Sequence, residues 1–172
     1  MTAKDQSDAK EMKPTVYIET TIPSLLTAWP NRDVEILAQQ VATREWWEKR
    51  RKAFDLYISQ EVLKEAARGD AGAARDRLAA LAECRILAAT DTAEALTERI
   101  LSTGLIPARA ASDAAHIGYA AAHGMDFLLT WNCRHILNKI IERRLAGVCV
   151  TMGLSLPVIC TPPELMASYL EL

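Results

Sequence analysis

Residues 112–130 read SDAAHIGYAAAHGMDFLLT. Ser112 is a residue type that caps helices, and Gly124 is one that ends them, so the spacing predicts a helix over residues 113–123. The apolar run at residues 127–130 is short, which is typical of a strand buried inside a sheet. This stretch therefore predicts a helix that leads into a buried strand.

The same alternation of helix and strand recurs along the whole chain. Short apolar runs predict five strands, at residues 16–18, 56–59, 85–87, 127–130 and 158–160. Helical spacing or capping residues predict helices at 33–52, 61–68, 70–83, 91–102, 113–123 and 134–145, and from 162 onward. Short buried strands that alternate with helices favour a mainly parallel sheet covered on both faces. We expect an α/β fold: three layers, α/β/α, around a central, mainly parallel sheet of about five short strands.

Length and composition predict one ordinary globular domain. The chain has 172 residues, of which 50% are hydrophobic and 24% charged, and one core of that size needs no disulfide or structural metal. We expect a flexible polar leader at residues 1–13 and a single domain at 14–172. We find neither a signal peptide nor an apolar run that could cross a membrane, so we expect a cytoplasmic protein. The four cysteines form no CxxC pair and complete no zinc spacing with the three histidines, which predicts reduced, mostly buried thiols.

Charge is unevenly distributed along the chain. The net charge of -2 gives no global attraction to nucleic acid, but residues 44–52 carry five basic and two acidic side chains. Residues 134–144 carry four basic side chains and one acidic one, whereas residues 146–172 contain no Lys or Arg. For either stretch alone, a solvated helix face is the commoner explanation. The alternative is a rim that contacts phosphates.

Several nucleotide and hydrolase signatures are missing. The seven glycines form neither GxGxxG nor GxxxxGK[ST], and the sequence contains no GxSxG or HExxH. A dinucleotide site or a P-loop is therefore not expected.

Oxygen-bearing side chains follow the predicted strands instead. Glu19 ends the first strand, Glu65 lies on the helix after the second, Asp113 opens a helix, and Asn132 follows the fourth strand. The carboxyl ends of parallel strands share one edge of the sheet, and clustered carboxylates suit Mg²⁺ or Mn²⁺. Each residue also has a plainer explanation, except that a carboxylate ending an apolar strand needs a partner. Glu65 could pair with Arg68, Asp113 could face a helix dipole, and Asn132 could cap a helix.

The order of these motifs resembles the PIN domain, the nuclease fold of the VapC-type toxins of bacterial toxin-antitoxin pairs. The resemblance spans about residues 16–160. The matching segments are a first strand that ends in an acid and threonines (VYIETT, 16–21), a Val-Leu pair before a Glu (ISQEVLKE, 58–65), an acid that opens a helix (DAAHI, 113–117) and a polar residue after the strand Thr (TWNCRHI, 130–136). In the family, the first and fourth positions are often Asp, where this chain has Glu19 and Asn132.

The resemblance implies a metal-dependent endoribonuclease that uses Mg²⁺ or Mn²⁺. Glu19, Glu65 and Asp113 would hold the cation, Asn132 would support the site, and Thr20 and Thr130 would orient the carboxylates. The basic side chains expected to contact RNA phosphates are Lys49, Arg50, Arg51, Arg134, Arg143 and Arg144. Trp131 could stack on a base, although core packing is the commoner role of such a residue, and Trp46 and Trp47 more commonly lie at a helix or dimer interface.

The resemblance also implies a homodimer and a cognate antitoxin protein as partners, with RNA as substrate. Two other functions stay open from the sequence. One is a catalytically weak or inactive PIN-like protein that binds RNA or acts as a scaffold, because Glu19 and Asn132 depart from the family pattern. The other is an unrelated small α/β hydrolase.

Overall fold

The structure is a computed structural model that describes residues 12–169. Most of the leader expected at residues 1–13 lies outside the described residues. The strands are β1 (Thr15–Ile18), β2 (Asp55–Ile58), β3 (Arg85–Ile86), β4 (Phe127–Leu129) and β5 (Val158–Cys160). The helices are α1 (Thr21–Thr27), α2 (Val34–Lys49), α3 (Gln60–Ala66), α4 (Ala71–Ala80), α5 (Asp91–Ser102), α6 (Ala111–Ala122), α7 (Lys139–Thr151) and α8 (Pro162–Tyr169), with 3-10 turns η1 (Arg51–Ala53) and η2 (Ala108–Ala110).

The five strands form one parallel sheet in the order β3-β2-β1-β4-β5. From β1 the chain first adds β2 and β3 on one side, and then returns to add β4 and β5 on the other. This reversal makes the carboxyl ends of β1 and β4 the switch point of the sheet, where ligands of open parallel sheets bind. The predicted α/β fold with a central parallel sheet is confirmed.

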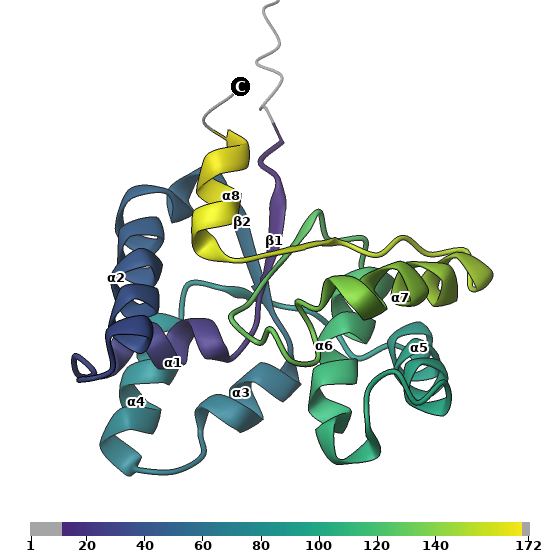
Figure 1. Ribbon diagram of the computed structural model, residues 1–172, viewed down its shortest axis with the longest axis horizontal. Helices are drawn as coiled ribbons and strands as arrows, with labels where there is room; N and C mark the ends of the chain where they lie inside the picture. The colour runs from purple at the N-terminus through teal and green to yellow at the C-terminus, as the bar shows by residue number, and fades with distance from the viewer. Residues whose placement is uncertain (1–11, 170–172) are drawn as a thin grey trace, which may run out of the picture.

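Helices cover both faces of this sheet. Figure 1 shows α1, α2 and α4 grouped on one side of the strands, α5, α6 and α7 on the other, and α8 beside α2. The central strand β1 is the most enclosed, because Val16, Tyr17 and Ile18 expose none of their surface. Within residues 12–169, no helix is both long enough and apolar enough to span a bilayer. Cys84, Cys149 and Cys160 are buried free thiols and Cys133 is an exposed one.

Two helices differ from the sequence prediction. Helix α1 was not predicted, because Thr-Thr-Ile-Pro resembles a turn; Pro23 lies in its first turn, where a missing N–H costs little. The helix predicted at residues 134–145 begins later, at Lys139, and runs to Thr151. Asn138 is its N-cap and accepts a hydrogen bond from the Ile140 amide at 3.0 Å, so residues 131–138 form an irregular loop instead.

Helix α2 turns polar side chains inward. Gln40 is buried and hydrogen-bonds both the carbonyl of Trp29 and the amide of Asn31, each at 2.9 Å. Thr43 is also buried and accepts a hydrogen bond from the indole N–H of Trp131 at 2.8 Å. These two side chains tie α2 to the loop that follows α1 and to the loop that follows β4.

Candidate metal-binding site

The candidate site lies at the edge of the sheet where β1, β2 and β4 end. Glu19 follows β1 directly, and its amide continues the pairing with β4 by donating to the Leu129 carbonyl at 3.1 Å. Helix α3 starts after β2 and packs against α6, which brings Glu65 to the same edge. The site is therefore built from segments that are distant in sequence but adjacent at the switch point.

Glu19 is a buried carboxylate that is held on one oxygen. Its side chain is 3% exposed, and Oε2 accepts hydrogen bonds from the hydroxyls of Thr21 and Thr130, at 2.5 and 2.7 Å. Thr130 is one of the two hydroxyls that the resemblance assigned to orienting carboxylates. The two threonines satisfy the carboxylate without any basic side chain, which offsets part of the cost of its burial.

Glu65 is also held on one oxygen. Its Oε2 accepts from the hydroxyl of Thr20, the other predicted orienting residue, and from Nε2 of His116 at 2.9 Å. Burial raises the pKa of Glu65, but the hydrogen bonds from His116 and Thr20 outweigh it and bring the pKa to about 2. Glu65 is therefore ionised at neutral pH. The pairing with Arg68 that the sequence left open gives way to these contacts.

His116 is the site residue that sequence reasoning missed. It is fully buried on α6, with Nδ1 2.9 Å from the hydroxyl of Tyr17, which in turn lies 2.7 Å from Oγ of Ser59. Burial lowers the pKa of His116, but the nearby carboxylates Glu65 and Glu19 outweigh this and raise it. One feature of the sequence could have identified it: His116 lies three residues after Asp113, on the same face of a predicted helix.

Glu19, Glu65 and His116 form a compact cluster whose nearest oxygen and nitrogen atoms all lie within 4.8 Å of one another. Two convergent carboxylates are hard oxygen donors of the kind that Mg²⁺ and Mn²⁺ prefer. In each carboxylate, Oε2 accepts hydrogen bonds from other side chains of the protein. Because few protein oxygens are then left to bind a cation, the site fits a divalent cation that keeps several waters.

Asp113 and Asn132, the other two predicted metal ligands, are bonded to the loop after β4. Asp113 lies outside that three-residue cluster, and its Oδ2 is 2.7 Å from Nδ1 of His135. Asn132 uses Oδ1 to accept from the amides of Arg134 and His135, at 3.3 and 3.1 Å. The structure thus brings Asp113 and Asn132 together through His135, and a direct contact of either with a cation stays a prediction.

The basic residues predicted at 49–51 lie at the other edge of the sheet. Helix α2 runs from the carboxyl end of β1 back to the start of β2, so Lys49, Arg50 and Arg51 lie near the amino ends of the strands. Arg51 also has partners within the chain: it lies over the ring of Trp47 and pairs with Glu83 at 3.2 Å. The two basic stretches do not flank one site.

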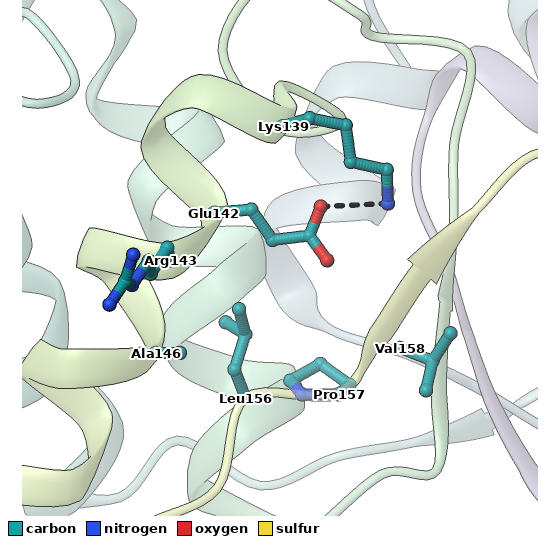
Figure 2. Close-up of a pocket in the computed structure, with 7 residues that line it drawn as sticks. All are labelled: Lys139, Glu142, Arg143, Ala146, Leu156, Pro157 and Val158. Atoms are coloured by element: carbon teal, nitrogen blue, oxygen red, sulfur yellow. Dashed lines mark ion pairs between the residues drawn. The ribbon is translucent and has the colours of Figure 1, made fainter.

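The other three predicted RNA contacts, Arg134, Arg143 and Arg144, follow β4 in the chain. Arg134 is exposed in the loop that contains Asn132, at the same edge as the carboxylates, while Arg143 and Arg144 are exposed on α7. Figure 2 shows Arg143 at a pocket between α7 and the start of β5, beside the Lys139–Glu142 ion pair of 2.8 Å. That pocket's one carboxylate is already paired, so it does not compete as a metal site.

Trp46 and Trp131 have packing roles. Trp46 is fully buried, and Trp131 is partly buried with its indole N–H bonded to Thr43. These contacts favour the packing explanation of Trp131 over base stacking.

The comparison with solved structures finds a similar fold, whereas the two sequence comparisons find no match. No family model matches this sequence, and no curated protein is matched by sequence similarity. Among solved structures, the chain is similar to one in the crystal structure of VapBC2 from Rickettsia felis bound to a DNA fragment from their promoter. The TM-score is 0.50 at 15% sequence identity, and the match covers 86% of this chain and 98% of that chain. This likeness supports a PIN-like, VapC-like fold.

Proposed function

We propose that the protein is a metal-dependent endoribonuclease that hydrolyses RNA phosphodiester bonds with Mg²⁺ or Mn²⁺. One observation carries the proposal: the carboxylates of Glu19 and Glu65 converge at the carboxyl edge of a PIN-like sheet, at its switch point. A divalent cation there would activate a water molecule for attack on the phosphorus and offset the charge that develops on the phosphate.

The chain's own residues would divide the remaining work. Glu19 and Glu65 would hold the cation through the carboxylate oxygens that the threonines leave available. Asp113 would approach the same site from α6 while it holds His135 in place. Asn132 would fix the loop that carries Arg134, whose exposed guanidinium could bind a phosphate of the RNA.

An RNA cleavage assay tests the proposal. Purified protein should cleave single-stranded RNA with Mn²⁺ or Mg²⁺ and stop when EDTA is added. Glu65→Gln and Asp113→Asn should each reduce the rate by about a hundredfold, because each removes a charge next to the cation. Glu98→Gln and Asp76→Asn are matched controls at exposed positions of α5 and α4 and should cleave normally. Cleavage that persists unchanged in both site variants would rule out this active site.

A PIN-like protein that binds RNA without cleaving it is the second candidate. It is favoured by the engagement of Asp113 with His135 and of Asn132 Oδ1 with two amides. RNA binding by the wild-type protein, with no cleavage in either metal, would support this candidate against the enzyme.

We further propose that the protein is the toxin of a toxin-antitoxin pair and forms a homodimer. The support is the likeness to a chain of the VapBC2 complex together with the family motifs. Light scattering should give twice the monomer mass, and the product of a short adjacent gene should copurify with the protein and stop RNA cleavage. Monomeric protein or the lack of such a binding partner would contradict these two assignments without touching the cleavage proposal.

A further inference from the structure

We propose that His116 is a positioning residue for Glu65 and not a metal ligand, and that Ser59, Tyr17 and His116 form a buried chain that fixes this carboxylate. The inference rests on the cation site of the proposed function. Within the cluster of three residues, Glu19 and Glu65 would contact the cation, whereas His116 would contact only Glu65.

The chemistry of the hydrogen-bond partners decides where the imidazole carries its protons. Nε2 of His116 lies 2.9 Å from Oε2 of Glu65, and an ionised carboxylate can only accept. Nε2 must therefore carry a proton whether the ring is neutral or charged. A nitrogen that donates a proton has no lone pair for a metal, so the atom nearest the cluster is excluded as a ligand.

The second ring nitrogen is also taken. Nδ1 lies 2.9 Å from the Tyr17 hydroxyl, which lies 2.7 Å from the hydroxyl of Ser59. If the ring is charged, Nδ1 donates to Tyr17 and Tyr17 donates to Ser59; if it is neutral, both bonds reverse direction. Both ring nitrogens and the Tyr17 hydroxyl have a partner in either state, which keeps the chain intact.

The chain is anchored in the central strand of the sheet and is fully buried. Tyr17 lies at the centre of β1 between Tyr57 of β2 and Leu128 of β4, and Tyr17, Ser59 and His116 expose none of their surface. Tyr17 and Glu19 are two residues apart along an extended segment, so they point to the same face of the sheet. The strand that supplies Glu19 therefore also supplies the hydroxyl that holds His116.

The consequence is that Glu65 offers one oxygen to a cation. His116 and Thr20 both bond to Oε2, and the Ser112 hydroxyl also interacts with this carboxylate, so Oε1 is the oxygen that a cation would take. Groups that orient a ligating side chain in this way contribute about tenfold or more to metal affinity.

Calorimetric titration of Mn²⁺ and of Mg²⁺ tests the inference without requiring RNA cleavage. Tyr17→Phe removes one hydroxyl and keeps the ring, and it should raise the dissociation constant for Mn²⁺ about tenfold. The dissociation constant for Mg²⁺ should rise by the same factor, because a positioning residue does not contact the ion. Tyr119→Phe, the same change at a half-buried position on α6, and Ile117→Val, a core change beside His116, should bind both ions like the wild type.

The substitution His116→Gln separates positioning from ligation. Its amide N–H can donate to Glu65, but its flexible side chain lacks the rigid ring that links Glu65 to Tyr17. Positioning therefore predicts that both ions bind more weakly by the same factor, with an unchanged Mn²⁺/Mg²⁺ ratio. An imidazole ligand would favour Mn²⁺, so a selective loss of Mn²⁺ affinity would overturn the inference. Normal binding by a folded Tyr17→Phe protein would also overturn it. If the wild-type protein binds neither ion, the proposed function itself fails.

Discussion

At the scale of single residues, short hydroxyl side chains do most of the positioning in the candidate site. Thr20, Thr21 and Thr130 hold the two carboxylates, and Tyr17 holds His116. A hydroxyl satisfies a carboxylate oxygen without neutralising its charge, which a lysine or arginine would do. The site therefore keeps negative charge available for a cation.

The sequence predicts only part of this arrangement. Glu19 is identifiable because a carboxylate that ends an apolar strand needs partners, and its threonine neighbours are visible beside it. His116 is not identifiable in the same way, because a histidine on an apolar helix face more often packs in a core. Its role depends on Tyr17 and Ser59, which come from two different strands and meet it only in the folded sheet.

The Glu65–His116 pair predicts how stability depends on pH in the metal-free protein. The pKa of Glu65 falls on folding from 4.5 to about 2, so its contribution is present above pH 4.5 and is lost as the pH falls toward 2. The pKa of His116 is raised from 6.5, so its contribution is full below pH 6.5 and is lost as the pH rises through the folded value. We expect the free energy of unfolding contributed by this pair to be largest between about pH 4.5 and 6.5.

Urea unfolding in EDTA between pH 2.5 and 9 measures this dependence. Glu65→Gln should flatten both sides of the curve, because it removes the partner of His116, whereas Glu98→Gln should leave the curve unchanged. A Glu65→Gln protein with the wild-type pH profile would show that the pair does not couple to folding.

At the scale of helices and strands, α5 and α6 approach each other closely at a glycine. Gly118 lies on the buried face of α6, and a Cβ there would collide with the Thr97 hydroxyl and lie 2.9 Å from the Ala93 carbonyl. Both contacts are on α5, and Ala93 contributes backbone that cannot move aside easily. Glycine at this position lets α5 lie against the helix that carries Asp113 and His116.

Gly118→Ala should therefore destabilise the protein by about 1–3 kcal/mol, the usual cost of forcing extra volume into a packed contact. Gly147→Ala on α7 is the matched control, because nothing lies within 4 Å of a Cβ there. That control should stabilise the helix by about 0.5–1 kcal/mol. Chemical denaturation of both variants measures the difference, and equal stabilities would contradict the close approach.

The strands were predictable from sequence, while two helix boundaries were not. Short apolar runs bounded by polar residues mark the strands, because both faces of a central parallel strand are buried. The edge strand β3 is the exception, since Arg85 and Ile86 are both exposed. Helix α1 was not predicted because it has only seven residues, begins at a threonine directly after the threonine N-cap, and includes a proline. Helix α7 was misplaced because hydrogen bonds of Asn132 and Asn138 organise the preceding residues, and helical periodicity does not report such local bonds.

At the scale of the whole molecule, the carboxylates of the candidate site and the basic stretch at the end of α2 lie at opposite edges of the sheet. Glu19 and Glu65 lie at the carboxyl edge of the strands, whereas the basic stretch lies at the amino edge with Lys13 and Arg85, where Asp55 and Glu83 also lie. Counting charges along the chain cannot distinguish the two edges. The direction in which α2 runs back to β2 decides at which edge its basic end lies, and that direction is known only from the fold.

This separation predicts unequal effects on RNA binding. Arg134→Ala, at the edge that carries the carboxylates, should weaken binding of a short single-stranded RNA severalfold, because it removes one phosphate contact. Arg50→Ala, at the opposite edge, should change binding of the same short RNA by less than about twofold, since too few phosphates reach that edge. Fluorescence anisotropy at fixed salt compares the two, and a larger effect of Arg50→Ala would place the RNA on the other edge.

Asn132 organises the loop after β4, which forms one wall of the candidate site. Backbone amides from Trp131 to Asn138 all donate to acceptors in the protein, and four of these bonds end on the side chain or carbonyl of Asn132. An irregular segment bonded in this way should exchange its amide hydrogens with solvent as slowly as helix α7, which follows it, does. The wall of the site beside Glu19 is therefore ordered before any ligand arrives, and binding there carries little entropic cost of ordering the loop.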